Sequence, residues 1–267
     1  MKPNIFKKPI FFNFDLAIVA LTGSLYALPI VGDLVVFGWQ RAFSFYAADA
    51  FYYLTVARNY AQTSVFTFDG IFPTNGFHPL WQVLLGILYK IELTFSMPDS
   101  TILVVVLSLS LLLILGGLIF IGKALQLVKG YIPVWLLLLP TGIYALLLAP
   151  FEPRFGSLWS FTNAMETAPL IFFFGMLMWL WSHTDFMQTR KSAITTGLNL
   201  SLIILSRLDH IFLVIAFFVY MTILLIVKRS GMKLLSNLVL AGIIPVIIVG
   251  LYVFANVMTT GMTLPVS

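Results

Sequence analysis

A series of apolar runs constrains this chain more than any other feature, because each run is as long as a lipid bilayer is thick, or nearly so. A helix needs roughly 17–25 mainly apolar residues to cross the hydrocarbon core. Charged residues make up only 9% of the chain, against about 25% in soluble domains. The sequence therefore predicts an all-α integral membrane protein with about seven transmembrane helices, at residues 16–36, 101–122, 131–150, 167–182, 193–206, 211–227 and 234–257.

A further apolar stretch, residues 78–95, either crosses the membrane or lies in its interface as an amphipathic helix. Charge counting favours the interface, because cytoplasmic loops collect Lys and Arg. If 78–95 does not cross and the N-terminus is cytoplasmic, ten of the fifteen basic residues lie inside; if it crosses, the distribution opposes the rule. We expect one transmembrane domain over 1–267, with juxtamembrane helices in a first extracytoplasmic loop at 37–100.

This topology predicts a multi-pass protein of the plasma (inner) membrane with a cytoplasmic, uncleaved N-terminal anchor. It places eight of the ten acidic residues on or near the extracytoplasmic face. The absence of cysteine excludes disulfides and thiol catalysis. The net charge of +5 does not indicate nucleic acid, because the basic residues stand between apolar runs without forming a basic stripe.

The densest polar region of the chain follows the first apolar run. Asp49, Tyr52, Tyr53 and Val56 have helical spacing and predict a short interfacial helix with an acid near its N-terminus. An aspartate at that place is also common as a helix cap or as a negative charge that favours the helix dipole. The loop that follows contains Asp69-Gly70 and Asn75-Gly76, which are ordinary turn dipeptides.

Taken together, three segments resemble prokaryotic GT-C-type membrane glycosyltransferases, and the resemblance touches three separate loops. The first segment is the most specific and resembles the first extracytoplasmic loop of these enzymes. The matching strings are Asp49 with Ala57-Arg58-Asn59, Thr67-Phe68-Asp69-Gly70 and Pro73-Thr74-Asn75-Gly76-Phe77-His78-Pro79-Leu80-Trp81; Asn163-Ala164-Met165-Glu166-Thr167; and Ser206-Arg207-Leu208-Asp209-His210.

The resemblance implies an inverting enzyme that transfers a sugar from a polyprenyl-phosphate donor to a glycan, lipid or protein acceptor on the extracytoplasmic side. In that family an acid after the first helix acts as base or metal contact, a role that falls here on Asp49. Relatives often carry two adjacent acids, whereas this chain has Ala48 in the first place, which favours base catalysis over metal binding. Members are usually longer, so the chain is expected to be a truncated member or the N-terminal portion of one.

The residue types fit this chemistry. A carboxylate such as Asp49 can accept the acceptor's hydroxyl proton, and cationic groups can stabilise the departing phosphate. For some candidates a lipid-headgroup contact, a salt bridge between Arg207 and Asp209, or a helix-dipole role for Glu166 is an equal alternative. A divalent metal, if used, would be held by Asp49 and His78. The expected substrate-binding residues are Arg58, Asn75, His78, Glu166, Arg207, Asp209 and His210.

Two other functions compete with the enzyme. One is a transporter or lipid-handling protein, in which acids form a path through the membrane; ionisable groups at mid-membrane would indicate it. The other is an inactive glycosyltransferase-like subunit, which Ala48 favours.

Overall fold

The computed structural model describes residues 31–129, 163–227 and 231–263. These parts consist of helices joined by loops, and the one β-type contact in them is an isolated bridge between Thr67 and Pro73. In chain order the elements are η1 (Trp39–Phe45), α2 (Ala48–Thr63), α3 (Pro79–Phe95), α4 (Asp99–Lys129), α7 (Thr167–Trp181), α8 (Arg190–Ser206), η2 (Leu208–His210), α9 (Ile211–Val227) and α10 (Met232–Thr260).

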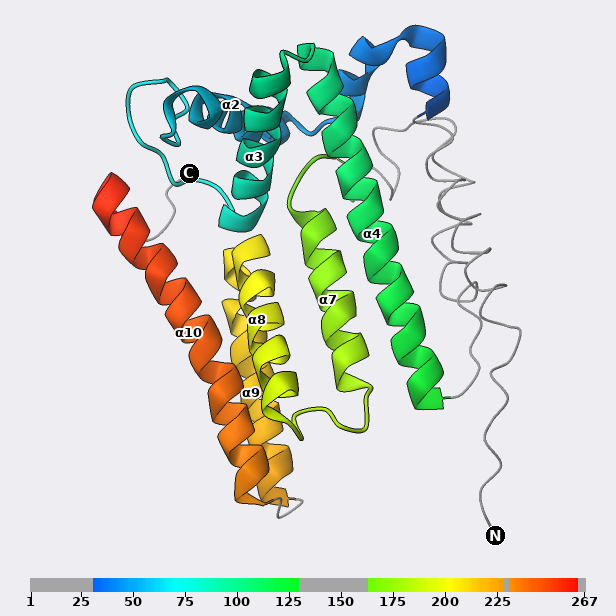
Figure 1. Ribbon diagram of the computed structural model, residues 1–267, viewed down its shortest axis with the longest axis vertical. Coiled ribbons are helices and arrows are strands. Elements are labelled where there is room, and N and C mark those ends of the chain that lie inside the picture. Colours follow the sequence, from blue (N-terminus) through cyan, green and yellow to red (C-terminus); the bar gives the residue numbers. More distant parts are fainter. Residues whose placement is uncertain (1–30, 130–162, 228–230, 264–267) are drawn as a thin grey trace.

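In the described parts of the chain, α4, α7, α8, α9 and α10 form a bundle (Figure 1). Helices α4, α7 and α9 run away from the end that carries α2 and α3, and α8 and α10 run back toward it. We call the end with α2, α3 and η2 the polar end. The opposite end is the basic end, because it carries Lys123, Arg190, Lys191 and Lys233.

Three helices of the described parts are long and apolar enough to cross a membrane: Asp99–Ala124, Leu208–Val227 and Met232–Thr260. Helix α7 is apolar but has only 15 residues, and α8 begins with two basic residues and has 17. The predicted span at 131–150 and most of that at 16–36 lie outside the described residues. The described parts of the chain are thus all-helical with three candidate spans, and the count of seven stays a prediction.

Residues 79–95 do form a helix, as predicted, but this helix, α3, is not among the candidate spans. It begins with Pro79, whose fixed φ and missing N–H suit the first helical turn. It ends at Ser96, which adopts a left-handed conformation (φ 50°) and turns the chain into α4. Helices α2 and α3 pack together at the polar end.

Small residues bring neighbouring bundle helices into close contact. A Cβ atom at Gly117 of α4 would lie 2.6 Å from the carbonyl oxygen of Ile171 in α7. A Cβ atom at Gly197 of α8 would lie 2.7 Å from that of Ala241 in α10. These glycines therefore permit the backbone-to-backbone approach that stabilises helix pairs in apolar surroundings.

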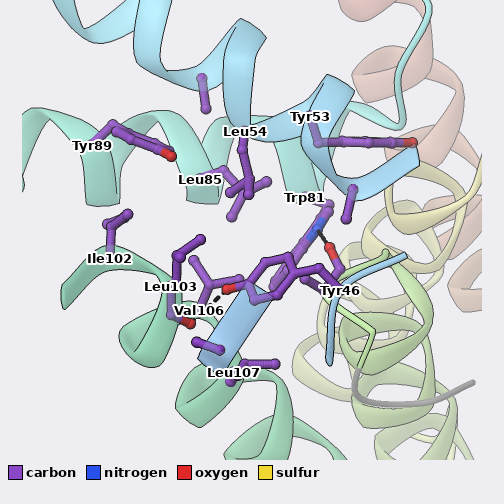
Figure 2. Packing of buried hydrophobic residues seen from close by; sticks show 14 of the residues in the cluster. Tyr46, Tyr53, Leu54, Trp81, Leu85, Tyr89, Ile102, Leu103, Val106 and Leu107 are labelled. Atoms are coloured by element: carbon purple, nitrogen blue, oxygen red, sulfur yellow. Dashed lines mark hydrogen bonds between the residues drawn. The ribbon is translucent and has the colours of Figure 1, made fainter. Parts of the chain in front are cut away.

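The buried apolar side chains form two clusters. One joins η1, α2, α3 and the first half of α4, and centres on Trp81, Leu85 and Val56, which are fully buried (Figure 2). The other joins α7 to α10 and includes Leu200 and Ile203. The polar segments 163–166 and 206–210 lie at the polar end, where the bundle meets α2 and α3 (Figure 1).

Candidate functional site

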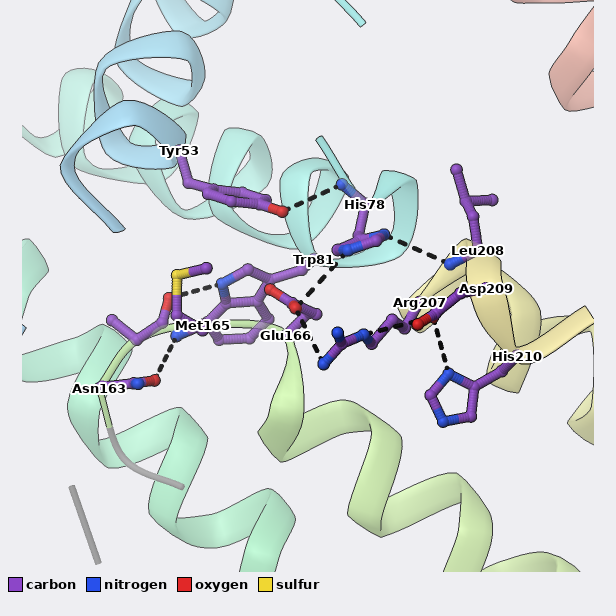
Figure 3. Close-up of polar contacts among 11 residues, drawn as sticks. Tyr53, His78, Trp81, Asn163, Met165, Glu166, Arg207, Leu208, Asp209 and His210 are labelled. Carbon is purple, nitrogen blue, oxygen red and sulfur yellow. Dashed lines mark hydrogen bonds and ion pairs between the residues drawn. The ribbon is translucent and has the colours of Figure 1, made fainter. Parts of the chain in front are cut away.

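Three loops that are far apart in the sequence bring ionisable side chains together at the polar end (Figure 3). His78 immediately precedes α3, Glu166 immediately precedes α7, and Arg207 immediately follows α8. Asp209 and His210 follow in η2. We call these five residues the polar cluster.

Glu166 is the buried centre of the polar cluster, with 5% of its surface exposed. Its Oε1 atom lies 3.6 Å from His78 Nε2 and 3.9 Å from Arg207 Nη1. Its Oε2 atom is buried without a hydrogen-bond partner among the described residues. A buried carboxyl group needs charged or hydrogen-bonding neighbours, and the guanidinium of Arg207 and the ring of His78 are those neighbours here.

Two hydrogen bonds fix His78. Its backbone N–H donates to the Tyr53 hydroxyl at 3.2 Å, and its Nδ1 accepts from the backbone N–H of Leu208 at 3.3 Å. With Nδ1 as acceptor, the ring proton of the neutral histidine lies on Nε2 and faces Glu166. Burial lowers the pKa of His78 below its ordinary value, against the opposing charge of Glu166. His78 is therefore held as a neutral donor aimed at the Glu166 carboxylate.

Arg207 connects the buried and exposed parts of the polar cluster. Its Nε atom lies 3.3 Å from Asp209 Oδ1, which confirms the salt bridge that was one of the alternatives for this residue. The same Asp209 oxygen lies 3.0 Å from His210 Nδ1. The Asp209 side chain is 58% exposed, so this side of the cluster opens to solvent.

The segment that carries Glu166 is fastened to the rest of the polar end by backbone contacts. The indole N–H of Trp81 donates to the Ala164 carbonyl at 2.8 Å, and the Ala47 N–H donates to the Asn163 carbonyl at 3.1 Å. Ala164 has φ 65°, a left-handed conformation that is uncommon for alanine and needs support from its surroundings.

Sequence reasoning missed Trp81 and Tyr53 as supports of the site. Burial and the charge of Glu166 raise the pKa of the Tyr53 hydroxyl above its usual value, so it stays protonated. The sequence could have indicated this role, because the N–H group of a buried Trp and the O–H group of a buried Tyr normally find a hydrogen-bond partner.

Asp49 lies in the first turn of α2 and is exposed. Asp49 does not cap this helix, because Ala47 is the N-cap and no side chain caps it. Its place in the first turn fits the other alternative, a favourable interaction with the helix dipole. No hydrogen bond or ion pair joins Asp49 to another residue in the parts of the chain that the structure describes. The Ala47–Asn163 hydrogen bond nevertheless brings the beginning of α2 beside the segment that carries Glu166.

The remaining candidates lie apart from the polar cluster. The Arg58 guanidinium pairs with Asp99 at 3.6 Å, with both side chains exposed. Asn75 is buried, and its amide donates to the Thr260 hydroxyl of α10 at 3.4 Å. Asp69 accepts the backbone N–H groups of Ile71 and Phe72, which confirms its turn and lowers the pKa of its carboxyl.

Among the described residues, no group of three or more His, Cys, Asp or Glu side chains is arranged to hold a metal ion. The predicted metal ligands Asp49 and His78 do not contact each other. A comparison of the chain with protein-family models, with curated proteins and with solved structures finds no match.

Proposed function

We propose that this chain is a membrane glycosyltransferase that uses a polyprenyl-phosphate sugar, and that its reaction takes place at the polar end, on the extracytoplasmic side. The proposal joins the sequence resemblance to one structural observation. Three distant loops place a guanidinium, two imidazoles and two carboxylates in one cluster at the end of the helix bundle, beside the start of the helix that carries Asp49.

This arrangement suits displacement of a lipid phosphate from a sugar. The acceptor hydroxyl oxygen bonds to the anomeric carbon, and its proton passes to the Asp49 carboxylate. The bond from the anomeric carbon to the phosphate oxygen breaks, and the phosphate keeps the electron pair. Arg207 and His210 lie at the open side of the cluster, where a guanidinium can bind phosphate through two parallel hydrogen bonds. Attack opposite the leaving phosphate inverts the anomeric configuration.

Glu166 has a different part from Asp49. It is buried against His78 and Arg207, so it orients these two groups from behind rather than meeting the substrate. Removing its charge would free Arg207 to turn toward Asp209 alone. Glu166 is therefore proposed as a positioning residue and Asp49 as the catalytic base.

A transporter is less well supported by the described residues. Ionisable side chains in transport paths lie near mid-membrane. Helix α9 contains no charged residue, and the only one in α10 is Lys233, next to its start. The ionisable groups of the described bundle gather at its two ends.

Sugar transfer by Asp49→Asn tests the proposal directly. The substitution keeps side-chain size but removes proton acceptance, and loss of a positioned base costs about 10²–10⁴-fold in rate. The matched control is Asp69→Asn, which affects an exposed turn and should leave the rate nearly unchanged. The measurement is transfer from a polyprenyl-phosphate sugar to a membrane acceptor, at equal protein level. A parent chain without transfer activity, or full activity in Asp49→Asn, would contradict the assignment.

A further inference from the structure

A cavity at the polar end is lined by none of the five residues of the polar cluster. It has a volume of about 320 Å³ and lies between the loop that follows α2 and the last turns of α10. Its walls are mainly apolar and include Phe66, Phe77 and Val83 on one side and Tyr252 and Ala255 on the other. The volume is at the lower end of that of small-molecule sites, about 300–1,000 Å³.

No charged residue lines this cavity. Lys90 contacts the lining residues Tyr60 and Ser64 but does not itself line the cavity. A phosphate buried among the apolar walls would therefore lose its hydration without a cation beside it, which is costly. The occupant that fits the walls has a neutral, apolar body. This separates the cavity from the polar cluster, where cationic groups are concentrated.

Two polar atoms in the α10 wall make no hydrogen bond of standard geometry to the described residues and have only a weak contact with each other. They are the Tyr252 hydroxyl and the Asn256 side-chain nitrogen, which lie one turn apart on the helix. Asn256 is 7% exposed. Buried hydrogen-bond donors normally find an acceptor in the protein or in a bound molecule, so a donor without one needs an explanation. A neutral oxygen next to an apolar chain would satisfy them.

The position of the cavity indicates where that molecule comes from. The lining residues of α10 belong to the last three turns of a helix that is long and apolar enough to cross a membrane. The end of such a helix lies at the boundary between hydrocarbon and headgroups, which is where the ester carbonyls of glycerophospholipids are found.

We propose that this cavity binds one acyl chain of a bilayer glycerophospholipid, whose neutral ester carbonyl accepts hydrogen bonds from Tyr252 and Asn256. The site goes beyond the proposed transferase function and does not depend on it. A polyprenyl phosphate is disfavoured as the occupant, because its chain carries no neutral carbonyl and its charged head finds no cation in the lining.

Photolabelling of the full chain tests this site. The protein is reconstituted in vesicles of phosphatidylethanolamine and phosphatidylglycerol that contain a phosphatidylethanolamine with a diazirine in its acyl chain, and labelled peptides are mapped after illumination. Adducts are expected in residues 64–83 and 252–259. Ala255→Trp, which fills the cavity from its rim, should abolish these adducts, whereas Val246→Trp, on an exposed face of α10 outside the cavity, should not change them.

A second variant keeps the test valid if the tryptophan disturbs folding. Asn256→Leu preserves the size of the side chain but removes the donor, and loss of one hydrogen bond should weaken labelling about 2–10-fold. Unlabelled phosphatidylethanolamine should compete with the probe. Equal labelling in Ala255→Trp and Val246→Trp, undiminished labelling in Asn256→Leu, or displacement by polyprenyl monophosphate in preference to phosphatidylethanolamine would each overturn the proposal.

Discussion

The polar end and the bundle hold their segments together in different ways. At the polar end, side chains donate to backbone groups far away in the sequence, as Trp81 does to Ala164. In the bundle, most buried or half-buried hydroxyls donate to a backbone carbonyl in the preceding turn of their own helix. Ser110 donates to Val106 in this way, and Ser201 donates to Gly197. Contacts between bundle helices come mainly from close packing at small residues such as Gly117. The exceptions among the described residues are two asparagines: Asn199 of α8 donates to the Phe173 carbonyl of α7, and Asn237 of α10 donates to the Met187 carbonyl.

This difference indicates which parts of the chain tolerate amino-acid substitution. Apolar packing between helices accepts many side chains of suitable size, but fails where a backbone contact leaves no room for a Cβ atom. A site made by long-range hydrogen bonds depends on individual donors and acceptors. The polar end is thus the region in which single polar atoms determine structure, as a functional site requires.

The largest expected effect is a difference in cysteine labelling between the two ends of the bundle, which are proposed to lie on opposite sides of the membrane. The parent chain has no cysteine, so single cysteines report cleanly. Ile71→Cys at the polar end should react with an impermeant thiol reagent in intact cells, because Ile71 is 73% exposed and this end is proposed to face outward. Gln188→Cys, in the exposed α7–α8 loop, should react only after permeabilisation. Labelling of Gln188→Cys alone would reverse the proposed orientation.

Bundle packing should respond strongly to one added methyl group. Gly117→Ala places a Cβ atom 2.6 Å from the Ile171 carbonyl oxygen, so α4 and α7 must separate, at a cost of about 1–3 kcal/mol. The control is Gly250→Ala in α10, where no heavy atom lies within 4 Å of the new Cβ. Thermal unfolding in detergent should show a clear loss for Gly117→Ala and none for Gly250→Ala; equal melting temperatures would refute the close α4–α7 contact.

A smaller effect is expected from protonation of His78. Burial lowers the pKa of this histidine in the folded chain, so the folded state resists a proton that the unfolded state accepts. The associated stability is present above the unfolded pKa of about 6.5 and is lost as the pH falls through the lower folded pKa. Melting temperatures measured from pH 8 to pH 5 should fall more steeply for the parent than for His78→Gln. His183→Gln, at the basic end, should behave like the parent, since it leaves the His78 contacts intact.

The apolar runs predicted the positions of α4, α9 and α10 closely, because a long apolar stretch has few alternatives to a helix in lipid. The spacing after Asp49 likewise predicted α2. Sequence reasoning also nominated all five members of the polar cluster, through the family resemblance. It gave no information on which of them would touch, since contacts such as that between Leu208 and His78 depend on how distant loops pack.

The roles of other residues in the site could not be predicted from the sequence, because they depend on contacts made only in the folded chain. Trp81 resembles any interfacial aromatic residue until its indole N–H is seen to meet Ala164. Asn75-Gly76 has the composition of an exposed turn, yet Asn75 is buried and bonded to α10. In both cases tertiary packing, rather than local preference, decides the role of the residue.

One helix offers the most direct test of the account, because α8 has an arginine at each end. Arg190 is its first residue at the basic end, and Arg207 follows its last residue at the polar end. If Arg207 stabilises the departing phosphate, Arg207→Gln should lower kcat/KM for sugar transfer by about 10²–10³-fold, as expected for loss of one charge-stabilising donor. Arg190→Gln should leave kcat/KM at the parent value. Equal effects of the two substitutions, or full activity in Arg207→Gln, would contradict the assignment of catalysis to the polar end.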